Sequence, residues 1–292
     1  MHQTFLIKGF PELSEDLHAL QKRADAIFAE ISFHVDYDIY FGGIRQILPL
    51  LRSKAQGQPV DLPVAEGRWL EEHGEPFIRR FLSLKAMGRF VDYFERRAFP
   101  GRCANAMTFQ ASQGTTSPIR WRGLPMMRTI WDFALAPLMV QEIRPRTIIE
   151  IGTASGGAAA YYADVQQLHG IQPNVITMDI APPAIQMSGV TIIRGDSKML
   201  AVSLPVEFLA PQPHPWIVIE DAHQAIGEFL EHMHLFVCKG DYLVIEDLDA
   251  ERDLFGFLSE HPTEYKVDTL FTDFFGHNNT CAPDQILCKI TE

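Results

Sequence analysis

The chain has 292 residues, of which 47% are hydrophobic and 21% charged, and its formal net charge at pH 7 is -12. This composition is typical of a soluble globular protein and argues against a disordered chain. The acidic balance argues against a binder of nucleic-acid backbones, because such binding depends on clustered Lys and Arg.

Two further classes are excluded by the distribution of apolar residues and cysteines. No apolar run approaches the roughly 18 residues that a membrane-spanning helix needs, and the N-terminal residues lack the pattern of a secretory signal. The four cysteines are scattered without CxxC spacing, which favours reduced thiols over disulfides or a zinc site: Cys103, Cys238, Cys281 and Cys288. We therefore expect a cytoplasmic protein that binds neither membranes nor nucleic acids.

The first 120 residues are expected to form a helical N-terminal region. Apolar residues recur at helical spacing from about residue 12 to residue 100, and no strand is predicted there. A polar, turn-rich passage at 99–123 predicts a loop or a weak boundary. The remaining residues, 121–292, form the second predicted domain.

After residue 130 the pattern alternates between helices and strands. An amphipathic helix is predicted over 130–143, a helix opened by glycines follows residue 157, and another follows residue 225. The predicted strands are rich in Val and Ile and cover 147–151, 175–180, 189–196, 215–221, 241–249, 265–271 and 285–290. Such runs alternating with helices predict a Rossmann-like α/β fold, with a mostly parallel sheet of seven strands and helices on both faces.

The stretch TIIEIGTASGG at 147–157 predicts a nucleotide-type cofactor site. Ligands of such sheets bind beyond the carboxyl ends of the strands, and glycines let a ligand approach bare backbone. The loop reads G-x-x-x-G-G after an acid, not G-x-G-x-x-G, which favours S-adenosylmethionine over a nicotinamide. The predicted cofactor-binding residues here are Glu150, Gly152, Thr153, Gly156 and Gly157.

Two later strand ends extend the predicted cofactor site. Asp179 ends the second strand, where an acid can accept hydrogen bonds from both ribose hydroxyls. Asp196 and Ser197 end the third strand, where the adenine would lie. Asp196 could instead cap a helix, and a glycine turn after a strand also occurs without any ligand.

The next two strands end on paired acids, Glu220 with Asp221 and Glu246 with Asp247. Neighbouring strand ends lie about 5 Å apart, so unpaired carboxylates there would repel one another. A hard divalent cation such as Mg²⁺ removes that penalty. His223 follows Glu220 by three residues and is the predicted general base.

A structural interpretation of the same residues stays open. The acids could cap helices or pair with Arg194 and Lys198, and a single histidine is more often structural than catalytic. The aromatic residues Trp121 and Trp131 could line an acceptor pocket, as could Tyr37, Tyr40 and Phe41, or could simply pack helices.

Several motifs together resemble the cephalosporin hydroxylase / rhamnosyl O-methyltransferase family. They are WRGLPMMRTIWDFALAPLMVQEIRPRTIIEIGTASGGAAAYYAD, VIEDAH, GDYLVIED and VDTLFTDFFGHNNTCAPDQILCK, which occur in order over about residues 121–290. The resemblance implies a class I methyltransferase fold that binds S-adenosylmethionine. Several relatives, including macrolide-sugar O-methyltransferases, use Mg²⁺ held by acids at the ends of strands four and five, and the family habit is a homo-oligomer.

Carried over to this chain, the resemblance implies metal ligands at Glu220, Glu246 and Asp247 and a base at His223. The family usually has Asp in place of Glu220 and a small residue in place of Asp221, so either residue could touch the metal. In similar enzymes N-terminal helices cover the site or build an oligomer contact.

The sequence therefore predicts a metal-dependent S-adenosylmethionine O-methyltransferase acting on a hydroxyl of a small, specialised (natural-product) metabolite. Alternatives are a hydroxylase-type or an N- or C-methylating member of the family, and a non-catalytic partner subunit that keeps the cofactor site. The missing G-x-G-x-x-G contradicts a nicotinamide oxidoreductase.

Overall fold

The computed structural model describes residues 2–6, 59–63, 88–96, 102, 104, 106–247 and 251–292. The chain divides into two compact units, residues 1–87 and 88–292. In the first unit β1 (His2–Leu6) pairs antiparallel with β2 (Pro59–Pro63), where no strand was predicted. Proline at both ends of β2 disfavours a helix there. Most of the predicted N-terminal helices, with Tyr37, Tyr40 and Phe41, lie outside the described residues. In the described part of the last one, residues 88–96, a strand at Phe90–Val91 precedes a short helix at Tyr93–Arg96.

The second unit begins ahead of residue 121, the predicted start of the second domain. Strand β3 (Phe90–Val91) pairs with β11 (Tyr265–Asp268), with Val91 opposite Val267. The short helix α5 (Tyr93–Arg96) follows, and its Arg96 is 0% exposed and paired with Asp273 and Asp284. These contacts join residues 88–96 to the second unit, a long-range pairing that local spacing does not reveal.

The predicted loop at 99–123 contains more regular structure than expected. Helix α6 (Ala106–Ala111) is followed by a hairpin of β4 (Ile119–Trp121) and β5 (Leu124–Met126). Arg122 and Gly123 connect the two strands with φ of 49° and 81°, the left-handed pair that two-residue hairpin turns favour.

One sheet of eight strands, in the order β3-β11-β12-β10-β9-β6-β7-β8, forms the centre of the second unit. Five strands are parallel: β6 (Thr147–Ile151), β7 (Val175–Asp179), β8 (Val190–Arg194), β9 (Trp216–Glu220) and β10 (Tyr242–Ile245). The closing strands β12 (Ile286–Lys289), β11 and β3 run antiparallel to their neighbours. All seven predicted strands are confirmed, and the short β3 is the eighth.

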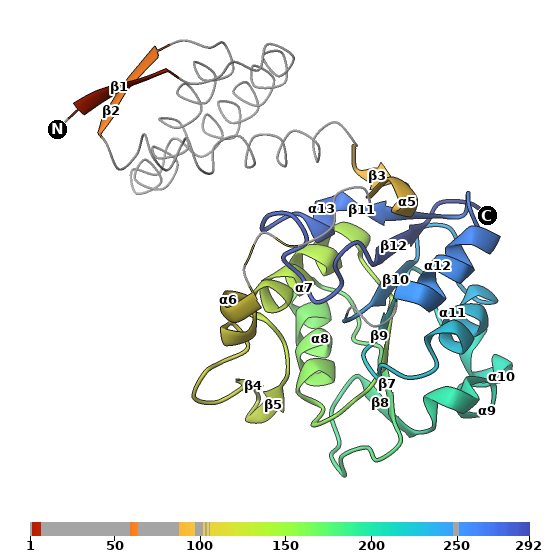
Figure 1. Cartoon of the computed structure of the whole chain (residues 1–292). Coiled ribbons are helices and arrows are strands. Elements are labelled where there is room, and N and C mark those ends of the chain that lie inside the picture. The colour runs from red at the N-terminus through yellow and green to blue at the C-terminus, as the bar shows by residue number, and fades with distance from the viewer. Residues whose placement is uncertain are drawn as a thin grey trace. The chain divides into compact units, whose positions relative to one another are not determined.

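Helices cover both faces of this sheet (Figure 1). On one face α7 (Ile130–Ile143) and α8 (Gly157–Leu168) contribute to a core with Ile148, Ile217 and Val244. The core of the other face contains Ile149, Val218 and Leu243 with residues of four helices: α9 (Leu200–Ser203), α10 (Val206–Leu209), α11 (Ile226–His234) and α12 (Glu251–Glu260). Two short elements complete the unit, the 3₁₀ helix η3 (Ser197–Met199) and α13 (Thr269–Thr272).

Local signals explain where α7 begins and ends. Thr129 caps its first turn by accepting a hydrogen bond from the Asp132 N–H, and Arg144 ends it in a left-handed conformation. The structure confirms the predicted bounds of 130–143 even though Pro137 lies inside the helix.

The first residue of α8, Gly157, leaves no room for a side chain. A Cβ atom there would lie 2.2 Å from the carbonyl oxygen of Pro125 in the hairpin. We expect Gly157→Ala to lower the free energy of unfolding by about 1–3 kcal/mol, because backbone and not a flexible side chain must move. Chemical denaturation measures the change.

Gly256 provides the matched control, since it lies inside α12 with open space around its Cβ position. Gly256→Ala is expected to stabilise the protein by about 0.5–1 kcal/mol through helix propensity. Equal stability of Gly157→Ala and wild type would show that the hairpin does not press on α8 in this way.

Candidate active site

The predicted site residues lie along the carboxyl edge of the parallel strands. Strand pairing continues past the strand ends, because the Asp221 N–H donates to the Ile151 carbonyl (2.8 Å) and the Glu246 N–H donates to the Glu220 carbonyl (3.0 Å). The ends of β6, β9 and β10 are therefore held in register. The acids at the end of β9 lie beside the glycine loop after β6, and those that follow β10 lie one strand further along the edge.

Strand alternation separates these acids between the two faces of the sheet. Side chains two positions apart share a face, so Glu150 follows Ile148 onto the face covered by α7 and α8, and Glu246 follows Val244 onto it. Glu220 instead follows Val218 towards the face covered by α11 and α12. The two adjacent pairs of acids thus cannot all point at the same place.

Arg128 lies between the hairpin and α7, and its side chain forms ion pairs with the acids of the first face. Its side chain is 4% exposed, and Nη1 is ion-paired with Oε1 of Glu246. Nη2 lies 3.3 Å from Oδ2 of Asp221 and 3.5 Å from Oε1 of Glu150. Burial would lower the pKa of Arg128, but Tyr162 and the carboxylates raise it, so the guanidinium stays charged.

The sequence analysis missed Arg128. Its only local signal is a basic residue directly before Thr129, the N-cap of the helix that follows β5. Arg194 and Lys198, proposed as structural partners for the acids, are not the cations found here.

Glu150 is 0% exposed and lies below the glycine loop. Its Oε2 accepts a hydrogen bond from the Thr177 hydroxyl (2.8 Å). Burial raises the pKa of Glu150 to about 7, against the opposing influence of Arg128 and Thr177. The predicted contact of Glu150 with the cofactor remains a prediction.

Protein contacts account for part of the glycine pattern. Gly152 has φ of 107°, and a Cβ there would lie 2.6 Å from the Asp221 carbonyl oxygen. Gly156 has φ of 79°, and a Cβ there would lie 2.7 Å from Cδ1 of Ile185. The Thr153 hydroxyl hydrogen-bonds to that of Thr177 at 2.7 Å, which fixes the loop to β7.

Asp179 joins the end of β7 to the glycine loop. Its Oδ2 accepts from the Ala154 N–H and its Oδ1 from the Ala181 N–H, each at 2.9 Å. The predicted acid and the predicted loop are therefore in contact. Ribose binding by Asp179 is not tested by these contacts.

Asp196 caps η3, because its Oδ1 accepts a hydrogen bond from the Lys198 N–H at 3.0 Å. The capping role offered as an alternative is thus confirmed, and Ser197 is the first residue of that helix. Adenine binding by these two residues stays a prediction.

His223 lies between two acids at the open part of the edge. Its Nε2 is 3.4 Å from Oδ1 of Asp221 and 3.2 Å from Oδ2 of Asp247, and its side chain is 40% exposed. Both His223 and Asp247 adopt left-handed backbone, with φ of 55° and 62°. Strained residues of this kind cluster at functional sites, which supports the prediction of a site here.

Glu220 presents a buried carboxylate, the group that binds hard cations. It is 0% exposed, and its Oε1 accepts from the Ala222 N–H at 3.1 Å. Its Oε2 is buried without a hydrogen-bond partner among the described residues, and burial raises the pKa of this carboxyl to about 7. A hard cation would pair that oxygen, so the residues present fit Mg²⁺.

The three predicted metal ligands are not a preformed cluster. In the described part of the chain, two groups of three His, Cys, Asp or Glu residues have ligand atoms within 4.8 Å of one another, and neither group contains a predicted metal ligand. They are His214, Cys238 and Asp241, and His234, His261 and Glu264. Glu246 is ion-paired with Arg128 on one face of the sheet. Strand alternation directs Glu220 and Asp247 to the other face, where Asp247 lies 3.2 Å from Nε2 of His223. The metal assignment therefore remains a prediction.

Comparison with known proteins identifies the family. The sequence model of the family described as Rhamnosyl O-methyltransferase/CmcI matches residues 113–283. The chain belongs to this family. The rhamnosyl O-methyltransferase of Mycobacterium bovis (strain BCG / Pasteur 1173P2) is 26% identical over 191 residues, covering 58% of this chain and 77% of the relative.

Solved structures of CmcI share the fold. A structure of CmcI with SAH is 25% identical with a TM-score of 0.51, covering 68% of this chain and 91% of that chain. A structure of CmcI with Mg and SAM is 24% identical with a TM-score of 0.53, covering 71% and 99%. Together with the family match, they confirm the predicted family, fold class and methyltransferase class; SAH, and Mg with SAM, are the ligands named for the two CmcI structures.

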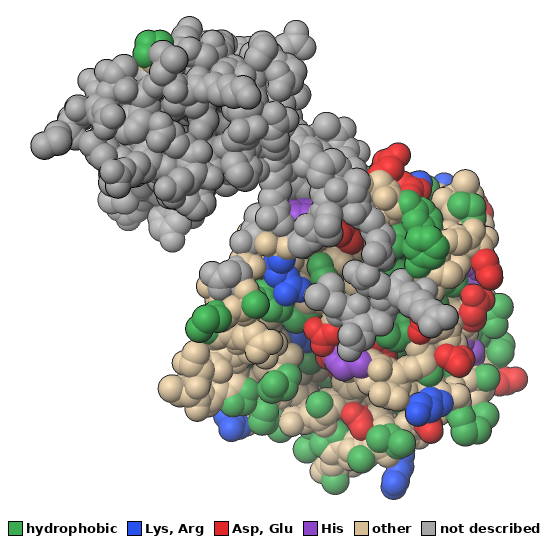
Figure 2. Space-filling model, in the orientation of Figure 1, with side chains coloured by type: hydrophobic (Ala, Val, Ile, Leu, Met, Phe, Trp, Pro, Cys, Tyr) green, Lys and Arg blue, Asp and Glu red, His purple; other side chains and the backbone are tan. Residues whose placement is uncertain are grey.

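The surface of the second unit mixes charge types. On the face drawn in Figure 2, acidic, basic and apolar side chains are interspersed, and a histidine lies beside acidic side chains near the centre of this unit.

Within the described ranges, no helix has the length and apolar character required to cross a membrane.

The raised pKa of Glu150 predicts a pH-dependent stability. A folded-state pKa of about 7, against an ordinary 4.5, means that unfolding releases a proton, so the free energy of unfolding falls as pH rises between these values. Glu150→Gln should reduce that fall by up to about 3 kcal/mol. Denaturation of the cofactor-free protein at several pH values measures it, and identical slopes in both proteins would contradict the assignment.

Removing the guanidinium of Arg128 should leave several buried or half-buried carboxylates without their positively charged partner. We expect Arg128→Met to lower the free energy of unfolding at neutral pH by about 3–5 kcal/mol. Arg122 is the control, because its side chain is 52% exposed while it pairs with Asp164, and Arg122→Met should cost less than about 1 kcal/mol. Similar losses in both variants would show that Arg128 has no special role.

Proposed function

We propose that the protein is a metal-dependent, cytoplasmic O-methyltransferase that transfers a methyl group from S-adenosylmethionine to a hydroxyl of a small specialised metabolite. The observation that carries the proposal is His223, whose Nε2 lies within 3.4 Å of Asp221 and 3.2 Å of Asp247. This histidine stands at the carboxyl edge of the sheet, beside the strand end that carries the glycine loop.

The glycine loop and the end of β7 would hold the cofactor. Asp179 offers carboxylate oxygens that already accept two backbone N–H groups, and ribose hydroxyls are donors of the same kind. Gly152, Thr153, Gly156 and Gly157 leave the backbone at the start of α8 without large side chains. Asp196 and Ser197 would lie towards the adenine.

Glu220, Glu246 and Asp247 are the proposed ligands of Mg²⁺, and Glu246 would have to exchange its ion pair with Arg128 for the cation. The unpaired oxygen of Glu220 supports this assignment, and Asp221 is the alternative ligand at the end of β9. When bound, the cation supplies Lewis acidity that lowers the pKa of a hydroxyl. Arg128 would keep neighbouring carboxylates neutralised on the other face.

His223 would take the proton from the acceptor hydroxyl at Nδ1, because the two acids beside Nε2 favour the tautomer that carries its own proton on Nε2. The carboxylates of Asp221 and Asp247 would stabilise the imidazolium that forms, since both already lie next to Nε2. The bound S-adenosylmethionine would supply the methyl group that the acceptor oxygen takes up once His223 has removed its proton. Holding both reactants in line contributes most of the rate, up to several powers of ten.

The curated relatives named rhamnosyl O-methyltransferase support a sugar hydroxyl as the first acceptor to test. Phenols and polyketide or peptide products are the further candidates. N- or C-methylation, hydroxylation and a non-catalytic partner role are outcomes of the experiment below, and a homo-oligomer is part of the proposal.

A matched pair of variants separates cofactor binding from chemistry. Calorimetric titration with S-adenosylhomocysteine should give weaker binding for Asp179→Asn and nearly unchanged binding for His223→Ala. With labelled S-adenosylmethionine and a panel of rhamnosides and phenols, His223→Ala should lower kcat at least about a hundredfold. A chelator should abolish transfer, and added Mg²⁺ should restore it.

His169→Ala is the control, because His169 lies at the far end of α8 and is only half-buried. It should leave both binding and transfer unchanged. Normal transfer by His223→Ala, or transfer that persists in chelator, would contradict the proposed mechanism. Cofactor binding without transfer to any acceptor would favour the partner-subunit alternative.

A further inference from the structure

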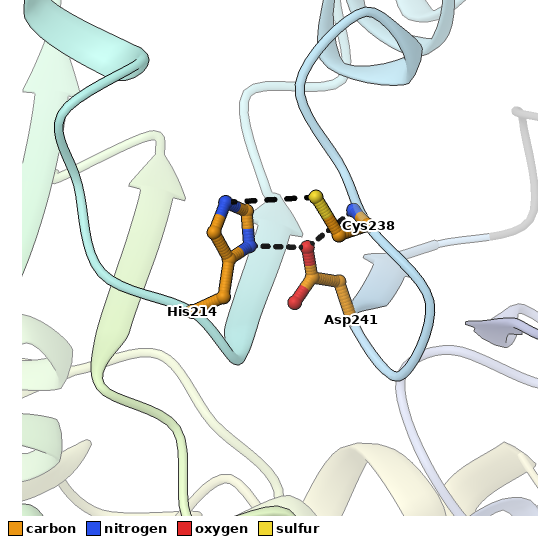
Figure 3. Close-up of side chains that lie close together, drawn as sticks. All are labelled: His214, Cys238 and Asp241. Carbon is orange, nitrogen blue, oxygen red and sulfur yellow. Dashed lines mark hydrogen bonds and ion pairs between the residues drawn. The ribbon is translucent and has the colours of Figure 1, made fainter. Parts of the chain in front are cut away.

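A second group of reactive side chains lies at the opposite edge of the sheet. His214 precedes β9 and Cys238 and Asp241 precede β10, so the three lie at the amino ends of the strands whose carboxyl ends carry the predicted active site. Figure 3 shows the three side chains converging from these two segments. The proposed methyl transfer uses none of them.

Asp241 fixes the position of His214. Its carboxylate is 1% exposed, its Oδ1 accepts from the Trp216 N–H (2.7 Å), and its Oδ2 accepts from the Cys238 N–H (2.6 Å). The same Oδ2 lies 2.7 Å from Nδ1 of His214, whose ring is stacked on Trp216 at 4.4 Å. An anionic acceptor at Nδ1 favours the tautomer that carries its proton there, which leaves a lone pair on Nε2.

The lone pair of Nε2 faces the thiol of Cys238, with Sγ at 3.8 Å (Figure 3). Cys238 is exposed, whereas Cys281 and Cys288 are buried. The order thiol, imidazole, buried carboxylate is the arrangement in which a base removes a proton from a nucleophile. Geometry therefore gives Cys238 an imidazole base at an exposed position.

A base is needed because the thiol does not ionise readily by itself. Partial desolvation and the charge of Asp241 raise the pKa of Cys238, with Lys289 acting in the opposite direction. The thiol is therefore protonated at neutral pH, and its reactivity depends on transfer of that proton to a neighbour.

Metal binding is the competing use of the same three residues. Zinc sites take three or four protein ligands. Both oxygens of Asp241 already accept backbone N–H groups and one also faces His214, so only Cys238 and His214 remain as unoccupied ligands. The contacts favour a reactive thiol over a metal centre.

We propose that Cys238 is a modification site, at which the thiol, deprotonated by His214, forms mixed disulfides with low-molecular-weight disulfides. The thiol proton passes to Nε2 of His214 as the sulfur attacks one sulfur of the disulfide. A new S–S bond forms, the old one breaks, and the departing thiolate takes the proton from His214. One thiol and one disulfide are consumed and one of each is produced, so no further oxidant is required.

The experiment uses the full chain and the aromatic disulfide dithiobis(nitrobenzoate), whose released thiol is followed by absorbance. Cys238→Ser identifies the contribution of Cys238, and peptide mass mapping locates the adduct. We expect His214→Gln to slow the reaction of Cys238 at neutral pH at least about tenfold, because the amide cannot take the proton. His232→Gln, a half-buried histidine on α11 outside the cluster, should react as wild type does.

Two readouts remain decisive even if His214→Gln folds poorly. In the wild type, the rate constant should level off at a pH well below the ionisation of the thiol, as a base-assisted reaction does. A rate that follows thiolate formation alone, or an unchanged rate in a folded His214→Gln, overturns the proposal. Stoichiometric protection of Cys238 by Zn²⁺, together with that unchanged rate, would assign the cluster to metal binding.

Discussion

The arrangement of the carboxyl edge depends on the ion pairing of Arg128. Three strand ends each contribute a buried or half-buried acid to the same face, namely Glu150, Asp221 and Glu246, and one guanidinium with a 4% exposed side chain lies among them. Without that cation the acids would repel one another or take up protons. The position of the hairpin and of α7 is therefore tied to the ends of β6, β9 and β10.

Strand alternation divides the edge into two functional sides. Acids on the α7 and α8 face are paired with Arg128, whereas the side chains of His223 and Asp247 are 40% and 61% exposed and one oxygen of Glu220 has no hydrogen-bond partner among the described residues. This division explains why two consecutive acids at one strand end have different partners. A cation at this edge would thus meet a set of carboxylates that Arg128 has already partly neutralised.

Much of the fold could be predicted from local patterns. Each strand predicted after residue 145 is present, and the Val/Ile-rich runs of β6 and β9 are buried on both faces. Proximity of Asp179 to the glycine loop, and of His223 to Asp247, followed from their positions at parallel strand ends. Arg128 could not be predicted, because nothing in the residues around it shows that its partners lie 22 to 118 positions away. Strand β3 was missed because its two residues carry no periodicity and its partner strand, β11, lies far along the chain.

Strand β3 and Arg96 determine which part of the chain can be studied alone. Val91 and Phe90 cover the outer edge of β11, and an uncovered edge strand offers free N–H and C=O groups to other molecules. Arg96 neutralises Asp273 and Asp284 beneath the C-terminal segment. A fragment starting at residue 121, where the family-like motifs begin, would lack both features and would be prone to self-association, whereas one starting at residue 88 retains the sheet edge and its buried charges.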